Sequence, residues 1–264
     1  MEVILNINNL NYKYFHDINL SFEREKLYFI VGPNKSGKTT LFRIMSSLIP
    51  TNNVISCDKV LLNKKNQKLY IRNIGVVERV NTYSFNYKTV LSEMLYPLLN
   101  LNYSLENAKK RINYILNYYN ISYLLDKKIN ELDIYEKQKL LLAISLLHKP
   151  KVLFLDGVLE IFSIKERKNI IKLLKKYISE EHISIIIFTT SLDDITENDQ
   201  IILLSKYKII KECFYNDLYN YDQLFYQNNL EIPFMIDLSI KLKTYNLINK
   251  NYTNKENLVD DLWD

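Results

Sequence analysis

Cysteine and histidine are scarce in this chain. Of its 264 residues only Cys57 and Cys213 are cysteines, and they stand far apart in the sequence. Isolated thiols suit a reducing compartment and exclude a disulfide framework. His16, His148 and His182 are singletons without the spacing of metal ligands. We therefore expect neither a disulfide-stabilised protein nor a Cys/His metal site.

Long apolar runs are absent as well. No stretch approaches the ~18 uninterrupted apolar residues of a membrane-spanning helix, and the N-terminus lacks the basic and apolar regions of a signal peptide. Repeats and low-complexity linkers are also missing. With 47% hydrophobic and 25% charged residues, the composition is that of a soluble globular protein. The length allows one large α/β domain or one domain with a helical insert.

The sequence also has no basic stripe interleaved with aromatic residues. Its net charge of +5 comes from scattered lysines, and Asn, Ile and Tyr are abundant. This pattern is typical of a genome with a strong A+T bias, so we do not expect a nucleic-acid partner.

Glycine is rare too, at four residues in the whole chain, but two of the four stand in one motif. The motif consists of Gly32, Pro33, Asn34, Lys35, Ser36, Gly37, Lys38, Thr39 and Thr40. It fits the G-x-x-x-x-G-K-[ST] phosphate loop, and a β-prone run precedes it while a helical pattern follows. Such a loop aims backbone N–H groups and a helix N-terminus at phosphates. A chance strand-to-helix turn is the alternative, but both flanks agree with the motif, which predicts a nucleotide-binding protein.

A second motif lies far downstream, where the apolar run 152–155 ends in Asp156. An acid at the end of such a strand, in a chain with a phosphate loop, is placed to hold Mg²⁺ together with the Thr39 hydroxyl. By itself it could equally be an acid that caps a turn. The two motifs together predict that ATP and Mg²⁺ are the cofactors.

The rest of the chain alternates strand-like and helical segments. Short β-prone runs occur at 3–7, 18–22, 27–31, 60–62, 69–71, 74–77, 152–156, 183–188, 201–204 and 208–211. Helical spacing dominates from about 87 to 149, recurs at 170–178, and characterises the tail. Strands alternating with helices predict an α/β fold with a parallel sheet covered on both faces.

On these motifs the chain resembles the ATP-binding subunits of ABC transporters. The resemblance covers residues 1–212 and rests on the loop 32–40 and on the run from Glu131-Leu132 to Asp156. It implies a P-loop NTPase (RecA-like) core with an antiparallel N-terminal β part and a helical subdomain at about 80–149. It also implies that Tyr14 stacks on the adenine of ATP.

The tail, residues 213–264, narrows the resemblance. Asn229-Leu230-Glu231-Ile232-Pro233-Phe234 looks like the C-terminal segment of energy-coupling factor (ECF) transporter ATPases. That family implies a helical dimerisation tail, a second ABC ATPase subunit as partner (a homologue or a second copy), and an integral-membrane scaffold subunit. It also implies a cytoplasmic protein, peripheral on the inner face of the cell membrane.

The sequence departs from the family at several functional positions. The signature loop is replaced by Leu-Asp-Ile-Tyr-Glu at 132–136, the catalytic glutamate by Gly157, the glutamine that contacts the metal site by Arg79, the switch histidine by Thr190, and the D-loop acid by Ser163. No glycine lies between Gly75 and Gly157, so no shift of alignment restores the signature.

These departures predict a chain that binds ATP·Mg²⁺ but hydrolyses it poorly. A positioned general base contributes about 10²–10⁴-fold to the rate, whereas phosphate binding depends on the loop, which is intact. We expect no catalytic residue at 157 or 190. Two alternatives remain: a soluble ABC-like ATP-sensing scaffold not involved in transport, and a competent hydrolase that uses another acid, such as Glu160 or Asp193.

Overall fold

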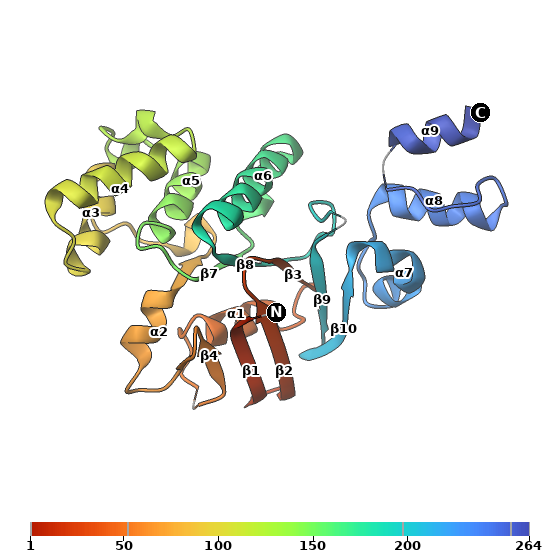
Figure 1. The fold of residues 1–264 in the computed structure, drawn as a ribbon, viewed down its shortest axis with the longest axis horizontal. Coiled ribbons are helices and arrows are strands. Elements are labelled where there is room, and N and C mark those ends of the chain that lie inside the picture. The colour runs from red at the N-terminus through yellow and green to blue at the C-terminus, as the bar shows by residue number, and fades with distance from the viewer. Residues whose placement is uncertain (1, 52, 197, 254, 264) are drawn as a thin grey trace. The chain divides into compact units, whose positions relative to one another are not determined.

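A computed structural model describes residues 2–51, 53–196, 198–253 and 255–263 (Figure 1). The chain divides into two compact units. The first consists of residues 1–27 and 39–188, and the second of residues 28–38 and 189–264. Within the described residues no helix is both long and apolar enough to cross a membrane.

The first unit begins with an antiparallel sheet. Its strands are β1 (Val3–Tyr12), β2 (Phe15–Glu23), β4 (Ile55–Cys57) and β5 (Val60–Leu61), in the order β2-β1-β4-β5. Along β2 Ile18, Leu20 and Phe22 are buried, while the residues between them, Asn19 and Ser21, face solvent. This period of two is what buries one face of the sheet. The strands predicted at 3–7 and 18–22 are present, and both are longer than predicted.

The same unit contains three parallel strands, β6 (Ile74–Val77), β7 (Val152–Asp156) and β8 (Ser184–Thr189). Their side chains are almost all buried, as expected for a parallel sheet covered on both faces. In the register of the sheet, Asp156 at the end of β7 lies beside Phe188 of β8. The carboxyl ends of these strands therefore form one edge, with Asp156 on it.

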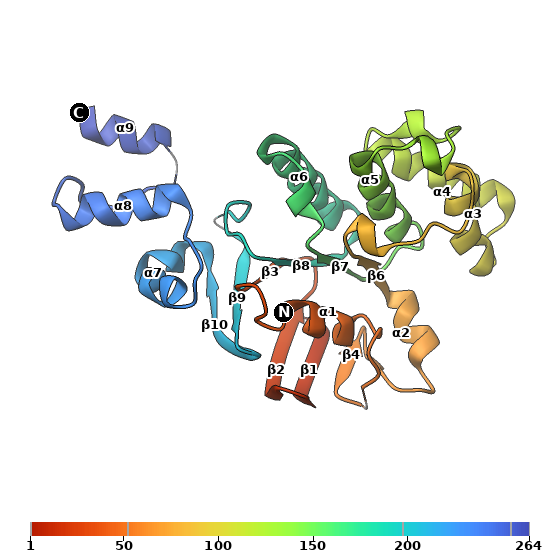
Figure 2. The same cartoon turned by 180° about the vertical axis from the view of Figure 1, so that it is seen from behind.

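Six helices accompany these strands within the described part of the first unit: α1 (Lys38–Met45), α2 (Gln67–Asn73), α3 (Val90–Asn100), α4 (Leu105–Tyr118), α5 (Ile134–Ser145) and α6 (Ile164–Glu181). Short 3₁₀ turns occupy Val80–Thr82, Ser122–Leu124, Ile129–Glu131 and Leu159–Ile161. Thr89, Ser104, Asp133 and Ser163 cap helices, each accepting a backbone N–H. Helix α3 packs on α4 (Figure 2), and the helical segment predicted from about 87 to 149 is confirmed.

The strand predicted at 69–71 is wrong, because these residues lie in helix α2. Leu69 and Ile71 are exposed, whereas Tyr70 between them is fully buried and its hydroxyl donates to the Met45 carbonyl at 2.6 Å. One buried tyrosine thus anchors the helix on the end of α1. Two apolar residues at i and i+2, Leu69 and Ile71, resemble the buried face of a strand in the sequence, but in this helix both face solvent.

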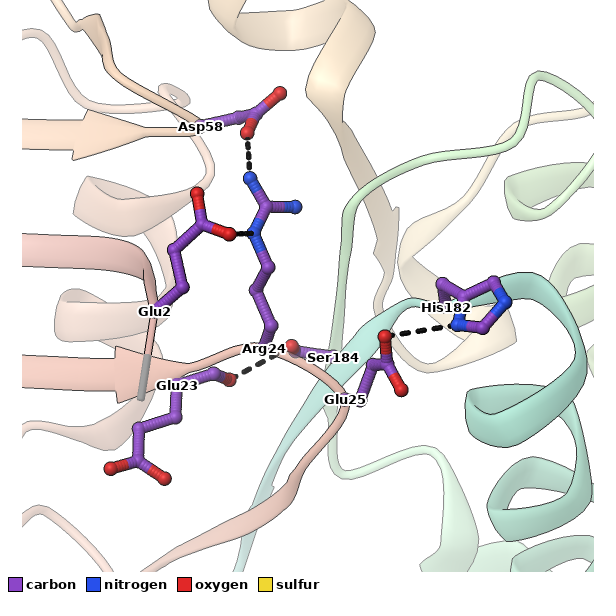
Figure 3. Close-up of polar contacts among 7 residues, drawn as sticks. All are labelled: Glu2, Glu23, Arg24, Glu25, Asp58, His182 and Ser184. Carbon is purple, nitrogen blue, oxygen red and sulfur yellow. Dashed lines mark hydrogen bonds and ion pairs between the residues drawn. The ribbon is translucent and has the colours of Figure 1, made fainter.

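Ion pairs and hydrogen bonds join the ends of the antiparallel strands to one another and to the segment where α6 ends and β8 begins, all within the first unit (Figure 3). Arg24, just after β2, pairs with Asp58 and with Glu2, its Nε lying 3.0 Å from Glu2 Oε2. The Ser184 hydroxyl donates to the Glu23 carbonyl at 3.0 Å. His182 Nδ1 lies 2.9 Å from Glu25 Oε1. These contacts fix the turn that leads into β3.

The second unit contains β3 (Leu27–Val31), β9 (Gln200–Ser205) and β10 (Lys208–Phe214), in the order β10-β9-β3. Strand β3 is parallel to β9, whereas β10 is antiparallel to it. The reversal follows from the two-residue turn Lys206-Tyr207, in which both φ angles are positive, the geometry of a tight hairpin.

The tail of the second unit is helical, as predicted. It forms the 3₁₀ turn Tyr215–Asp217 and the helices α7 (Leu218–Gln227), α8 (Phe234–Thr244) and α9 (Lys255–Trp263). Ile248, Tyr252 and Leu258 form a small buried cluster against Met235, Leu238 and Leu242 of α8. The tail therefore has an apolar core of its own.

Candidate functional site

The loop after β3 has a backbone that only glycine permits at two points. A Cβ on Gly32 would overlap the Leu204 carbonyl oxygen and lie 2.6 Å from the Ser36 Oγ, and Gly37 has a φ of 109°. The Gly32 N–H donates to the Thr189 carbonyl at 3.3 Å, and the Tyr207 N–H donates to the Ser36 carbonyl at 2.8 Å. The strands on either side therefore hold the loop in its curled shape.

Two polar side chains of this loop fit an anion. The Lys38 ammonium lies across the loop, with Nζ 2.6 Å from the Gly32 carbonyl and 2.9 Å from the Pro33 carbonyl. Ser36 is 2% exposed, and its hydroxyl has no hydrogen-bond partner among the described residues. A buried hydroxyl without a partner is costly unless a ligand or water satisfies it. Asn34 and Lys35 are exposed, and Pro33 is half-buried.

Helix α1 carries Thr39 and Thr40 in its first turn, and it packs on β8. The rings of Phe42 and Phe188 meet edge to face with centroids 5.5 Å apart, and Phe188 is the register partner of Asp156. The first turn of α1 and the end of β7 therefore belong to the same edge of the parallel strands. A threonine hydroxyl and an aspartate carboxylate are oxygen ligands of the kind that Mg²⁺ prefers.

These residues fit magnesium held mainly by phosphate and water. Nowhere in the described ranges do three His, Cys, Asp or Glu side chains gather as a metal site. Mg²⁺ in phosphate-transfer sites is usually held by one or two protein ligands, with substrate phosphates and waters completing its shell. Thr39 and Asp156 would supply those ligands here.

Arg79 and Gly157 lie together at this edge. Arg79 follows β6 by two residues, Gly157 follows Asp156 directly, and the guanidinium of Arg79 rests on the Cα of Gly157 while it pairs with Glu160. A guanidinium is a donor only, so it cannot itself ligate a metal ion. The sequence identifies Arg79 and Gly157 as two separate departures from the family, but it does not predict that they are in contact.

The segment 132–136 is a helix start in this chain. Asp133 caps α5, with Oδ1 accepting from the Glu136 N–H at 2.7 Å, and Glu136 Oε2 accepts from the Asp133 N–H at 3.1 Å. Ile134 and Tyr135 are 41% and 44% exposed. The side chains that replace small signature residues thus form a capping box and present apolar groups to solvent.

The remaining predicted positions lie at loop and helix ends. Tyr14 is in the turn between β1 and β2, and its side chain is mostly exposed. Ser163 caps α6. Thr190 lines a hollow of about 710 Å³ together with Asp193 and residues of the tail motif 229–234. The switch position and the tail motif thus share one surface of the second unit.

Gln138 is a residue that sequence reasoning missed. It is fully buried in α5; its Oε1 accepts from the Val80 N–H at 2.8 Å and its Nε2 donates to the Glu78 carbonyl at 3.2 Å. It therefore holds the backbone on both sides of Arg79. Its sequence neighbours are mostly charged or exposed, so no local signal marks it as buried.

Comparison with known proteins agrees with the family that the sequence motifs resemble. The family described as ABC transporter matches residues 15–159. The chain is 30% identical to the energy-coupling factor transporter ATP-binding protein EcfA of Aster yellows witches'-broom phytoplasma, over 98% of each chain. It is 27% identical to EcfA1 of Mesomycoplasma hyopneumoniae, over 97% of this chain and 93% of the relative.

Two solved structures share the fold. One is cbiO1 from Clostridium perfringens, described as part of the ABC transporter complex cbiONQ, with a TM-score of 0.76 at 24% identity over 90% of this chain and 99% of that one. The other is a dimeric ATP-binding cassette in a post-hydrolysis state, bound to ADP and Pi, with a TM-score of 0.70 at 22% identity over 80% and 98%. Both confirm the α/β, P-loop NTPase fold that the sequence predicts.

Proposed function

This chain belongs to the ABC transporter family, as an ATP-binding protein of the energy-coupling factor kind, and we propose that it binds ATP·Mg²⁺ while contributing little hydrolysis of its own. The observation that carries the proposal is that the residues for binding phosphate are present, whereas the residue expected to act as general base is missing. The phosphate loop keeps its glycines, Lys38 and a buried, unpartnered Ser36 hydroxyl. The residue after Asp156 has no side chain at all.

Binding follows from the loop. Lys38 would take the β- and γ-phosphates, the backbone N–H groups of 34–38 would surround them, and Thr39 and Asp156 would hold the magnesium ion. Magnesium supplies charge neutralisation between the phosphates when it is bound. We propose that Tyr14, which is 67% exposed, stacks on the adenine base.

Weak hydrolysis follows from what surrounds Asp156. Gly157 offers no base, and Glu160, the next acid along the chain, is engaged in an ion pair with Arg79. Thr190 lacks the imidazole that could exchange a proton near neutral pH. The lack of a general base lowers the rate of hydrolysis by about 10²–10⁴-fold. This chain would therefore keep ATP bound without hydrolysing it at a useful rate.

The partners follow from the family. We propose that the chain pairs with a second ATPase subunit, either a homologue or another copy, and that the pair energises import through an integral-membrane scaffold at the inner face of the cell membrane. Phe234 in the tail motif is 73% exposed. A large apolar residue exposed to this extent supports a contact between the tail and one of these partners. A scaffold of this kind would leave substrate choice to another subunit.

The test compares two lysine substitutions in the complex purified from its own cells. Lys38→Ala in this chain should remove one bound nucleotide and leave most ATP hydrolysis, whereas the same change in the partner ATPase should abolish hydrolysis. Bound nucleotide is counted after rapid gel filtration, and hydrolysis by phosphate release. Rapid turnover by this chain alone would refute the proposal.

Purification of the tagged chain decides between transport and a soluble role. Recovery of an integral-membrane subunit in detergent supports the transporter. A complex that contains only soluble proteins, with ATP-dependent assembly, would favour an ATP-sensing scaffold instead.

A further inference from the structure

Lysines occur throughout the chain, but the excess of positive charge lies in one stretch. The whole chain has a net charge of +5, from 35 Lys and Arg against 30 Asp and Glu. Residues 59–77 contain no acid and five of the cations, so the rest of the chain is neutral overall. A codon bias toward lysine would spread the excess along the chain and does not explain this concentration. The five cations are Lys59, Lys64, Lys65, Lys68 and Arg72.

Helix α2, which lies beside β4 in the first unit, has a well-defined inward side (Figure 2). Tyr70 is fully buried. Gln67 Nε2 donates to the Ser47 hydroxyl at 3.1 Å, and Asn73 Nδ2 donates to a carbonyl of β4 at 3.4 Å. Residues 67, 70 and 73 are spaced by three, so they share one side of the helix. That side faces the body of the first unit.

The outward side of α2 carries two like charges. Lys68 and Arg72 are both exposed and four residues apart, so they are neighbours on the helix surface opposite Tyr70. Like charges at this spacing destabilise a helix. Within the described residues neither side chain forms an ion pair that would offset the repulsion. The two charges therefore do not serve the stability of the fold.

Exposed aliphatic side chains flank this pair. Leu69 and Ile71 are 53% and 47% exposed. Since successive residues of a helix are turned by about 100°, they lie on either side of the line through Lys68 and Arg72. Leu61, in the strand β5 that contacts α2, is exposed as well.

The other three cations adjoin the same elements. Lys59 directly precedes β5, and Lys64 and Lys65 lie in the turn that leads into α2. All three are exposed. The exposed side chains of residues 59–72 are together called the α2 surface. It combines concentrated positive charge with exposed aliphatic groups.

This combination matches an anionic lipid surface. Lysine and arginine are attracted to anionic headgroups, and aliphatic side chains enter the boundary between headgroups and acyl chains. Nucleic acid has no use for exposed aliphatic side chains, since its phosphates pair with cations and its bases stack on aromatic rings. Tyr70 is the one aromatic residue of the segment, and it is buried.

We propose that the α2 surface binds the anionic headgroups of a membrane, with Lys68 and Arg72 on lipid phosphates and Leu69 and Ile71 inserted beside them. The inference goes beyond the proposed function, in which a scaffold subunit holds the chain at the membrane, because here the chain itself contacts lipid. One cation near an anionic membrane strengthens binding about five-fold, equal to about 1 kcal/mol. Five cations contribute on the order of 10³-fold, which suits reversible binding.

Sedimentation of the full chain with lipid vesicles tests this. Wild type should bind vesicles of phosphatidylcholine and phosphatidylglycerol, mixed at about three to one, and should not bind phosphatidylcholine alone. Salt above physiological strength should release it, because salt screens the attraction. Lys68→Gln with Arg72→Gln should weaken binding about 20-fold. Leu69→Gln with Ile71→Gln should weaken it roughly ten-fold and leave its salt dependence unchanged.

The matched control is Lys168→Gln with Lys172→Gln. These lysines are exposed at the same four-residue spacing on α6, in the same unit. The control therefore removes an equal charge from another helix, and it should change vesicle binding by less than about two-fold. Circular dichroism and nucleotide retention, both expected to equal those of wild type, show that each variant is folded.

Equal weakening by the α2 and α6 double variants would overturn the inference, because binding would then follow net charge alone. So would binding of wild type to phosphatidylcholine vesicles, or no binding to the anionic ones. Tighter binding to a nucleic-acid duplex, lost in Lys68→Gln with Arg72→Gln, would assign the surface to nucleic acid instead. Vesicle binding is measured without nucleotide, so its failure leaves the proposed function standing. A chain that binds vesicles but retains no nucleotide refutes the proposed function alone.

Discussion

Replacing Arg111 by alanine is expected to destabilise the region formed by α4, α5 and α6. The Arg111 side chain is 8% exposed, and its Nη1 lies 2.7 Å from Glu181 Oε1. Its Nε and Nη2 donate to the carbonyls of Leu147 and Leu146 at 3.1 and 2.9 Å, and Nη2 also lies 2.7 Å from the Tyr177 hydroxyl. One side chain thus joins α4 to the end of α5 and to α6.

Its loss removes a donor from the carbonyls of Leu146 and Leu147 and takes away the nearer of the two cations that pair with Glu181. The other cation, Lys149, lies 3.5 Å from Glu181 Oε2 on a side chain that is 59% exposed. Glu181 is only 13% exposed, and breaking a buried ion pair costs about 3–5 kcal/mol. We expect Arg111→Ala to lose about that much free energy of unfolding at pH 7. Urea unfolding followed by the helical circular dichroism signal measures it. The control is Lys110→Ala, whose pair with Glu106 is 72% and 76% exposed.

The pH dependence supplies a second check. Burial alone would raise the pKa of Glu181, but the hydrogen bonds and charges of Arg111 and, to a smaller extent, of Lys149 outweigh it, so the pKa of Glu181 lies below the ordinary value of 4.5. A carboxyl group whose pKa is lower in the folded state than in the unfolded state stabilises the fold at any pH above its unfolded pKa. This stabilisation is lost as the pH falls through the folded-state pKa. The difference in the free energy of unfolding between wild type and Arg111→Ala should therefore become smaller as the pH falls into the acid range. A loss below about 1 kcal/mol at pH 7, comparable to that of an exposed pair, would refute the reasoning.

The other predictions concern thiols, a cap and the loop. Burial raises the pKa of Cys57 and of Cys213 to about 12, so neither should react with iodoacetamide at pH 8 until urea unfolds the chain; rapid labelling of the native protein would contradict this. Asp133→Ala should cost about 1 kcal/mol of unfolding free energy through loss of the α5 cap, while Asp133→Asn, measured in the same urea titration, should restore most of it. Gly32→Ala pushes a Cβ into the Leu204 carbonyl oxygen and should abolish nucleotide retention on gel filtration. Normal retention by that variant would show that the loop can move aside.

The strands and the phosphate loop were predictable because their signals are local. Val152–Asp156 is a run of apolar residues that stops at an acid, and its burial matches what a covered parallel strand requires. The loop 32–40 carries its chemistry in consecutive residues. Helix α2 was missed because its one buried residue, Tyr70, depends on a tertiary contact with the end of α1 that no local pattern contains.

The candidate site was only half predictable for the same reason. Asp156, Gly157 and Arg79 could be located one by one, but Arg79 and Glu160 are 81 residues apart in sequence. Their pairing arises only when β6 and β7 lie side by side. The burial of Gln138 could not be predicted from the sequence, because a glutamine among charged residues is normally a surface residue.

The scarcity of glycine has a consequence for the whole backbone. Gly32 and Gly75 stand where a Cβ would strike a carbonyl oxygen, and Gly157 stands where it would strike Arg79. Elsewhere in the described residues, left-handed backbone is adopted by residues with side chains, mostly Asn, Asp and Lys, such as Asn120 and Lys149. Residues with side chains leave the unfolded chain fewer conformations than glycine does, so each such turn costs strain in the folded protein and lowers the entropy lost on folding. These turns therefore have fewer conformations open to them than glycine turns would have.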